Sequence, residues 1–197
     1  RGTDAEQRVR LAPDRPYFNA AAWSPNGRTL AYVGNGALDP AVNVRGAELF
    51  FIQPGSSIPQ QATFLFAEYG AVRINGYLPE ELSWSPDSRY IAFWVIELLG
   101  SDIEANTGNA TLHLLDAASG EVRRYCGFAT TSHTPKPPRI IWSPDGTHIA
   151  FAGDVAQDGR GALVLAKDIE SGLITELSEG VYPALGIPDL VAWGNRP

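Results

Sequence analysis

Apolar and polar residues alternate along this chain in short runs that are separated by turn-forming residues. An apolar strand that ends in Trp23 is followed by Ser-Pro-Asn-Gly and then by the alternating residues 30–32. Nearly the same unit returns at 83–93 and at 141–151. Proline presets φ at the first central turn position, Asp or Asn suits the second, and Gly accepts the left-handed conformation that follows. Each unit is therefore predicted to be a β-hairpin with a short loop.

A second hairpin follows each of these units. Its strands are rich in β-branched and aromatic residues, at 48–52 and 62–66, at 111–116 and 121–125, and at 162–166 and 173–177. Four strands per repeat are typical of a β-propeller blade and not of a helical solenoid. The predicted fold class is all-β, without a helix. Residues 1–197 are read as one propeller segment with complete blades at 19–66, 80–126 and 139–178, and with partial blades at 5–12 and 189–197.

Two features of the repeat make specific structural predictions. Ser88 stands where the other units have Gly27 and Gly146, so its backbone is expected to be strained by about 1 kcal/mol relative to Gly. The tryptophans that recur with the repeat are predicted to pack the core, because large aromatics at periodic apolar positions do so. They are Trp23, Trp84, Trp142 and Trp193, whereas Trp94 lies outside the repeat, so a surface role stays open for it.

Net charge and the lengths of the apolar runs exclude two classes of partner. The formal net charge is −7, and nucleic-acid binding needs a basic surface, so nucleic acid is not an expected partner. No run of about 18 apolar residues occurs, so no membrane-spanning segment is predicted. The single cysteine, Cys126, forms no internal disulfide and is read as a small half-buried strand residue.

The sequence contains no recognisable catalytic or metal-binding pattern. No Gly-x-Ser-x-Gly sequence is present, and the repeating Ser of each Ser-Pro turn has a structural explanation. His113, His133 and His148 lack the spacing of metal ligands, and residues 154–158 lack the order of a calcium loop. The sequence therefore predicts no catalytic residue, no metal and no cofactor.

The unit Trp-Ser-Pro-Asp-Gly-x-x-Ile-Ala-Phe, followed by an apolar strand ending in Asp and by a Ser-Gly turn, resembles the TolB-type, WD-like propeller repeats. The resemblance covers about residues 19–193. It implies a propeller of about six to eight blades, in proteins that are often exported, and hence an extracytoplasmic (periplasmic or secreted) location. Such blades occur in TolB-like accessory proteins, in regulatory domains of prolyl-oligopeptidase-type serine peptidases, in tricorn-like peptidases and in pectate-degrading lyases.

Three complete blades are too few to close a ring, since closed propellers have about four to eight. The chain starts at Arg1 and has no methionine, so it is expected to be a processed chain or a piece cut from a longer polypeptide. Open sheet edges are a liability that proteins cover. The expected partners are therefore further propeller blades, from the same polypeptide or from a second chain, besides a protein ligand.

The candidate binding residues follow from blade geometry. In an up-and-down blade the first and third turns share one face, so the longer segments gather on the other face, where binding groups concentrate. Aromatic and basic residues there are the candidates: Tyr69, Arg73, Tyr77, His133, Lys136 and Tyr182. The leading hypothesis is a non-catalytic protein-binding or scaffolding module. The alternatives are the regulatory propeller of a prolyl-oligopeptidase-like peptidase and a carbohydrate-binding or lyase propeller.

Overall fold

The structure of the chain is a computed structural model. The structure describes residues 20–39, 44–75, 82–97, 110–130, 139–155, 163–178 and 190–194. The predicted partial blade at 5–12 lies outside these residues. Apart from one short helix, every element of the described residues is a β-strand, which confirms the all-β prediction.

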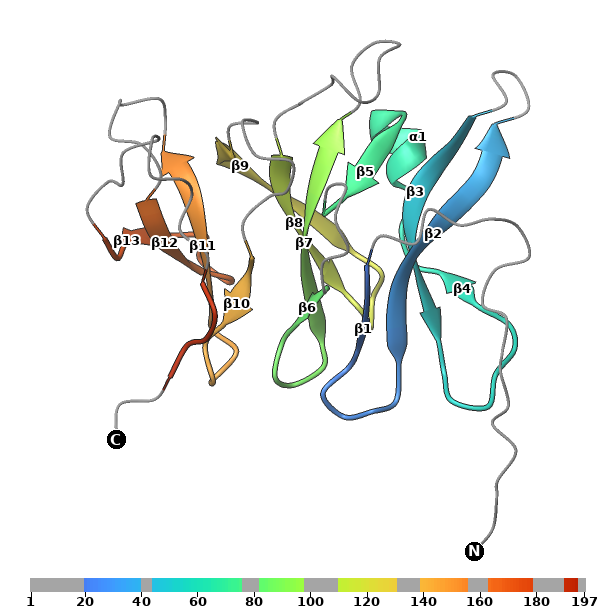
Figure 1. The fold of residues 1–197 in the computed structure, drawn as a ribbon, viewed down its shortest axis with the longest axis horizontal. Helices are drawn as coiled ribbons and strands as arrows, with labels where there is room; N and C mark the ends of the chain where they lie inside the picture. Colours follow the sequence, from blue (N-terminus) through green and yellow to red (C-terminus); the bar gives the residue numbers. More distant parts are fainter. Residues whose placement is uncertain are drawn as a thin grey trace, which may run out of the picture.

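The strands form three antiparallel blades side by side in a fan (Figure 1), and blades 2 and 3 are joined into one sheet where β9 pairs with β11. Blade 1 has the order β1-β2-β3-β4. In blade 2 both β6 and β5 pair with β7, which pairs with β8 and through it with β9. Blade 3 has β10 beside β11, followed by β12 and β13. The strand bounds are β1 Ala21–Trp23, β2 Leu30–Asp39, β3 Val44–Ile52, β4 Gln60–Gln61, β5 Val72–Ile74, β6 Ser83–Trp84, β7 Tyr90–Glu97, β8 Ala110–Asp116, β9 Val122–Thr130, β10 Ile141–Trp142, β11 His148–Val155, β12 Leu163–Asp168 and β13 Ile174–Glu176.

The Ser-Pro turns close each first hairpin through their own side chains. In blade 3 the Ser143 hydroxyl donates to Asp145 Oδ1 at 2.6 Å and accepts the His148 N–H at 2.9 Å. Ser24 and Ser85 make the same pair of contacts in blades 1 and 2. The structural role predicted for these serines is therefore what the structure shows.

Ser88 has the backbone conformation that the repeat predicts. Its φ is 64°, beside 69° at Gly27 and 71° at Gly146. Its hydroxyl has gained a contact, since it accepts the N–H of Asn26 in blade 1 at 3.1 Å. The turn of blade 2 is thus tied to the turn before it.

Two apolar cores lie between the blades. Between blades 1 and 2, the side chains of Ile91, Phe93 and Val95 pack against residues of β2 and β3. The alternate positions of the same strand, Ala92 and Trp94, contribute to the core shared with blade 3. Both faces of blade 2 are therefore buried, as expected for a sheet that packs between two other sheets.

Trp94 was left open by the sequence, and Trp23 differs from its prediction. Trp94 is buried, with its ring edge-on to Phe151 at 5.6 Å, so it belongs to the core and not to the surface. Trp84 and Trp142 are buried as predicted, but Trp23 is 53% exposed. The reason is that each of these indoles packs against the blade before it, and among the described residues no blade precedes blade 1.

The outer part of blade 1 also corrects the sequence reading. A strand was predicted at 62–66, but β4 is only Gln60–Gln61, and a short helix, α1 (Leu65–Tyr69), follows. The carboxylate of Glu48 accepts backbone N–H groups at the start of this turn, which favours a helix over a strand there. Residues 34–39 and 44–46 are strand, because β2 and β3 extend their hairpin beyond the first turn of the blade. No helix of the described residues is long and apolar enough to cross a membrane.

Candidate functional site

The turns and the longer segments occupy opposite ends of the blades. Figure 1 shows the first and third turns at the lower end, with α1 and β5 at the upper end. We call the lower end, formed by turns such as 24–27, 53–55, 85–88 and 117–120, the short-turn face. We call the upper end, formed in the described residues by α1, β5 and the neighbouring ends of β8 and β9, the loop-rich face.

The helix on the loop-rich face is fixed by a buried carboxylate. Glu48 is 1% exposed, and its carboxylate accepts hydrogen bonds from the Thr63 hydroxyl at 2.6 Å and from the N–H groups of Leu65 and Phe66 at 2.8 and 2.9 Å. Burial raises the pKa of Glu48, and these three hydrogen bonds oppose that rise. A carboxylate held by three donors orients α1 on β3.

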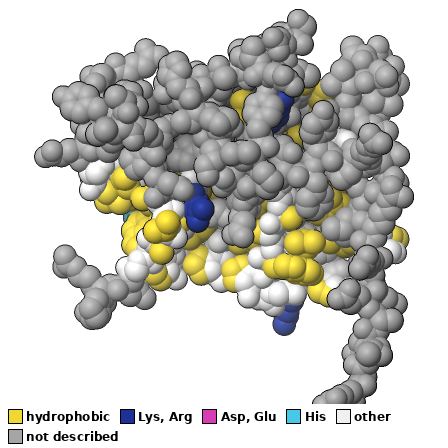
Figure 2. Space-filling model, in the orientation of Figure 1, with side chains coloured by type: hydrophobic (Ala, Val, Ile, Leu, Met, Phe, Trp, Pro, Cys, Tyr) yellow, Lys and Arg dark blue, Asp and Glu magenta, His cyan; other side chains and the backbone are white. Residues whose placement is uncertain are grey.

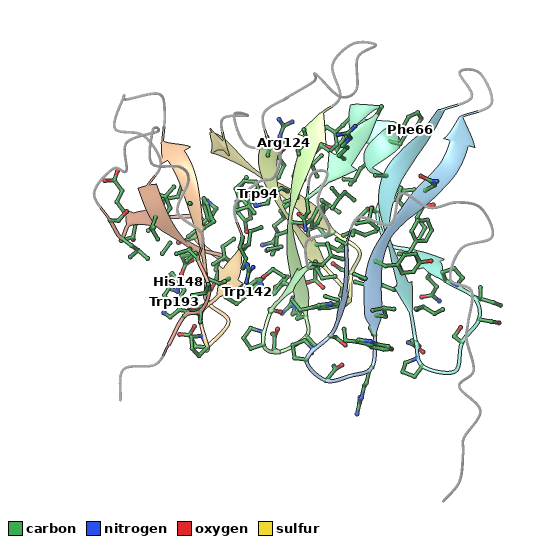
Figure 3. The ribbon with its side chains drawn as sticks, in the orientation of Figure 1. Phe66, Trp94, Arg124, Trp142, His148 and Trp193 are labelled. Atoms are coloured by element: carbon green, nitrogen blue, oxygen red, sulfur yellow. The ribbon has the colours of Figure 1, made fainter. Side chains whose placement is uncertain are left out.

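Gly46 allows this close approach of helix and strand. A Cβ atom at Gly46 would clash with the Phe66 Cβ, and the packed chain could not accommodate it without a shift. Figure 3 places Phe66 at the upper end, beside the strands of blade 1. Glycine is therefore required at this position for the packing of α1 on β3.

Tyr69 links α1 to blade 2. Its hydroxyl lies 3.3 Å from His113 Nε2, and its ring meets the His113 ring edge-on at 5.5 Å. The Arg124 guanidinium lies over the Tyr69 ring, 5.4 Å from its centre. The pKa of Tyr69 is raised to about 12, mainly by burial and further by the Glu68 carboxylate, while Arg124 acts in the opposite direction. The phenol is therefore protonated at neutral pH.

His113 is the buried part of this cluster. It is fully buried in β8, its Nδ1 lies 3.0 Å from the Thr111 carbonyl oxygen, and its ring stacks on Phe93 at 5.8 Å. A carbonyl only accepts, so Nδ1 carries the proton and, in the neutral ring, Nε2 accepts the proton of the Tyr69 hydroxyl. Burial lowers the pKa of His113, and the charge of Arg124 lowers it further. The histidine is a neutral structural link, as its place in an apolar strand predicts.

The sequence-predicted binding residues divide into two groups. Tyr69 and Arg73 lie on the loop-rich face, where Arg73 is half-buried in β5 and pairs with Ile96 of β7. Tyr77, His133, Lys136 and Tyr182 lie outside the described residues. The structure adds Arg124, which the sequence analysis did not select because it sits in a regular strand and not in a long segment. Arg124 is exposed and lies over the Tyr69 ring, which only the fold brings about. Figure 3 shows Arg124 at the upper end of the molecule.

A groove of about 590 Å³ runs across the inner strands of the fan. Figure 2 shows hydrophobic side chains where Figure 1 places these strands. The groove is lined by residues of β1, β6, β10 and the segment 190–194, among them Trp23, Trp84, Trp142 and Trp193. Trp193 lies near His148, with the ring centres 6.3 Å apart (Figure 3).

The inner strands are tied to one another along this groove. The Trp84 Nε1 donates to the Ala22 carbonyl oxygen at 3.1 Å, and the Trp142 Nε1 donates to the Ser83 carbonyl oxygen at 3.0 Å. In both cases the acceptor is the residue just before the tryptophan of the preceding blade. The Ser83 hydroxyl adds a bond to the Ile140 carbonyl oxygen at 2.8 Å.

A second groove, of about 430 Å³, lies on the short-turn face between blades 1 and 2. Phe51 and Trp84 stack at its base with ring centres 5.9 Å apart, and the rim is polar. Across the described ranges, no three His, Cys, Asp or Glu side chains stand close enough together to hold a metal ion.

Comparison with solved structures places this arrangement among known folds. A structure from a study of two prolyl endopeptidases has a TM-score of 0.53 and 15% identity, covering 83% of this chain and 23% of the other. A puromycin-hydrolysing peptidase of Mycobacterium tuberculosis has a TM-score of 0.53 and 12% identity, covering 82% and 21%. The fold is that of a β-propeller. At these identities the likeness shows the fold alone.

A putative TolB from Agrobacterium tumefaciens is 18% identical, with a TM-score of 0.48, over 87% of this chain and 54% of the TolB chain. The chain thus spans about half the length of TolB and about a fifth of the peptidases that it matches. No family model matches the chain, and no curated protein matches it either.

Proposed function

We propose that this chain is a non-catalytic β-propeller module that binds a protein partner through its loop-rich face and so acts as a scaffold. The observation that carries the proposal is the Tyr69–Arg124 pair. The guanidinium lies over the phenol ring at 5.4 Å, and Arg124 is exposed. Tyrosine and arginine are the residue types that dominate the binding energy of protein interfaces.

The pair is held in place before any partner arrives. Tyr69 is fixed by its hydroxyl contact to the buried His113, and its helix is fixed by the carboxylate of Glu48. A side chain that is already ordered loses little conformational entropy on binding, which favours affinity. The rigid blades below supply the scaffold on which such groups are usually presented.

The short-turn face offers a contrasting surface. Its turn carboxylates are occupied by the turns themselves, since Asp145 accepts from the Ser143 hydroxyl and from the Thr147 N–H and hydroxyl. The pKa of Asp145 is lowered to about 2, chiefly by the Ser143 hydrogen bond. Polar groups that already bond within a turn contribute less to binding a partner than an ordered Tyr–Arg pair whose arginine is exposed.

Site-specific photocrosslinking tests the proposal. A photoreactive residue is placed at the exposed Glu68 on the loop-rich face and, as the matched control, at the exposed Ser119 on the short-turn face. The Glu68 position is expected to form one discrete protein adduct in cells, and Arg124→Ala is expected to reduce its yield at least about fivefold. Adducts that form from Ser119 and not from Glu68 would contradict the proposal.

The location we propose is extracytoplasmic, on the strength of the resemblance of the repeats to those of exported TolB-like proteins. Fractionation of cells that make the native protein tests it. The protein is expected outside the cytoplasmic fraction, and recovery with a cytoplasmic marker enzyme would contradict this location.

A second candidate function is the regulatory propeller of a serine peptidase. It is favoured by the fold shared with a prolyl endopeptidase structure, at a TM-score of 0.53. In that case the native polypeptide carries a nucleophilic serine outside these 197 residues. A fluorophosphonate probe, which labels activated serines, decides between the two: labelling of the native polypeptide favours the peptidase, and its absence with a positive control peptidase favours the binding module.

A further inference from the structure

The groove on the short-turn face between blades 1 and 2 has an aromatic base and a polar rim. Phe51 and Trp84 stack at the base with ring centres 5.9 Å apart, and the first and third turns of both blades form the rim. Its volume of about 430 Å³ lies within the roughly 300–1,000 Å³ of clefts that hold small molecules. The groove is therefore large enough for a small ligand.

Hydrogen bonds between the two blades hold the groove at a fixed width. The Trp84 Nε1 donates to the Ala22 carbonyl oxygen at 3.1 Å, and the Asn26 N–H donates to the Ser88 hydroxyl at 3.1 Å. The first bond joins the walls at the base, and the second joins them at the rim. A ligand thus meets a site that is already formed, which reduces the entropy lost on binding.

The third turn of blade 1 departs from the repeat inside this groove. In blades 2 and 3 the residue that starts this turn is an aspartate, Asp116 or Asp168, and its Oδ1 accepts backbone N–H groups of the turn. By the strand pairing of the repeat, Gln53 takes this position in blade 1. The Gln53 side chain is exposed and makes no hydrogen bond within the described part of the chain, so its amide is available to a ligand at the rim.

Two further side chains offer hydrogen-bonding groups at the rim. The Gln60 amide is exposed and, among the described residues, makes no hydrogen bond. The Arg89 guanidinium is held from one side, because its Nε and Nη2 donate to Asp116 Oδ2 at 3.1 and 3.0 Å, and its Nη1 is left for another acceptor. An amide both donates and accepts, and a guanidinium donates in a fixed plane.

The charges of the groove cancel. Asp87 and Arg89 are the charged side chains among the described residues that line it, one of each sign. A neutral ligand loses less solvation on entering such a site than an ion does. The aromatic base suits the apolar face of a ring, and the amides suit hydroxyl groups, which likewise donate and accept.

We propose that this groove is a binding site for a neutral carbohydrate. One face of a sugar ring packs on the aromatic base, and its hydroxyl groups pair with the amides of Gln53 and Gln60 and with the Arg89 guanidinium. An extended peptide fits less well, since it pairs with free backbone groups, and the turn N–H groups of Gly27 and Ser88 are bonded to carbonyls of their own turns. The groove lies at the opposite end of the blades from the loop-rich face, so the proposal does not depend on the protein partner proposed there.

Binding of the labelled native protein to an array of neutral and acidic oligosaccharides tests the site. Binding to neutral oligosaccharides is expected, and the strongest of them is then used in calorimetric titrations. Gln53→Ala combined with Gln60→Ala is expected to raise the dissociation constant about tenfold, because two hydrogen bonds are lost from exposed side chains that the fold does not use. The control is Glu170→Ala, which truncates an exposed side chain of similar size at the third turn of blade 3 and is expected to leave the dissociation constant unchanged.

Proton–nitrogen correlation spectra show whether the carbohydrate occupies this groove. The same oligosaccharide is expected to shift the indole signal of Trp84 and to leave that of Trp142, which lies at the next blade boundary and outside the groove. An array without any neutral binder would overturn the proposal, as would a double variant that binds as tightly as the wild type, or a shift at Trp142 and not at Trp84. Shifts of Trp84 with a pool of short uncharged peptides and none with oligosaccharides would identify a peptide site instead, and would also overturn it.

Discussion

The indole Nε1 of Trp84 donates to the Ala22 carbonyl oxygen at 3.1 Å and so joins the inner strand of blade 2 to that of blade 1. The Trp142 indole makes the equivalent bond to Ser83. The tryptophan of the repeat is therefore both a core side chain and a hydrogen-bonded tie between neighbouring blades. Because an indole has one N–H donor and this donor is directed at the inner strand of the preceding blade, the bond sets the spacing of the two blades.

Trp84→Ala is expected to lower the free energy of unfolding by about 3–5 kcal/mol, as truncation of large buried aromatics does. Trp84→Phe keeps the stacking with Phe51 and loses only the tie, so it should cost less. Urea unfolding followed by circular dichroism measures both. Trp23→Ala is the comparison, since this residue is half exposed, and under dilute conditions its cost is expected to be less than half that of Trp84→Ala. Equal costs at the two positions would contradict the assignment of Trp84 to a blade boundary.

Substitutions at Ser88 separate two effects on stability, the cost of its left-handed backbone and the gain from its side-chain hydrogen bond. Ser88→Gly relieves a left-handed backbone by about 1 kcal/mol and loses the hydrogen bond from the Asn26 N–H, which contributes about 0.5–1 kcal/mol. The two effects nearly cancel. Ser88→Ala keeps the strain and loses the bond, so it is expected to be less stable than Ser88→Gly by about 1 kcal/mol. Chemical unfolding of both variants checks the difference, and an alanine variant as stable as the glycine variant would show that the φ of 64° costs nothing.

Glu48 gives a stability term that depends on pH. Burial raises the pKa of Glu48 in the folded protein above its unfolded value, so the folded state binds this proton more tightly. The contribution of protonated Glu48 to the free energy of unfolding is therefore present at acid pH, and it is lost as the pH rises through the folded-state pKa. The stability of the wild type relative to Glu48→Gln is expected to be greater at pH 4.5 than at pH 7, measured by urea unfolding. The opposite trend would mean that the three hydrogen bonds outweigh burial.

His113 makes the stability of the protein depend on pH in the opposite direction. Its pKa is lowered by burial and by Arg124, so its contribution is present above the unfolded-state pKa, near 6.5, and is lost as the pH falls through the folded-state value. His113→Gln removes this titration. From pH 7 to pH 5 the wild type is expected to lose stability relative to that variant, as followed by thermal unfolding. A constant difference over this range would show that protonated His113 is tolerated between Tyr69, Arg124 and Glu68.

The periodic features of this protein could be predicted from the sequence, and the non-periodic ones could not. The Ser-Pro hairpins and the left-handed Ser88 were predictable because turn chemistry is local. The exposure of Trp23 was not, since it depends on which blade lies before it. The helix α1 was missed because its cause is Glu48, a residue distant in the sequence whose carboxylate reaches the start of the helix. Arg124 was missed for the same reason: only the fold brings it over Tyr69.

Hydrogen exchange of the indole N–H groups tests most directly the claim that tryptophan ties hold the blades together. In proton–nitrogen correlation spectra, with signals assigned by single Trp→Phe variants, the indoles of Trp84 and Trp142 are expected to exchange at least about a hundredfold more slowly than free indole, because both are hydrogen-bonded and buried at blade boundaries. Exchange of either indole at the rate of an exposed tryptophan would contradict the account, since the boundary would then lack its tie.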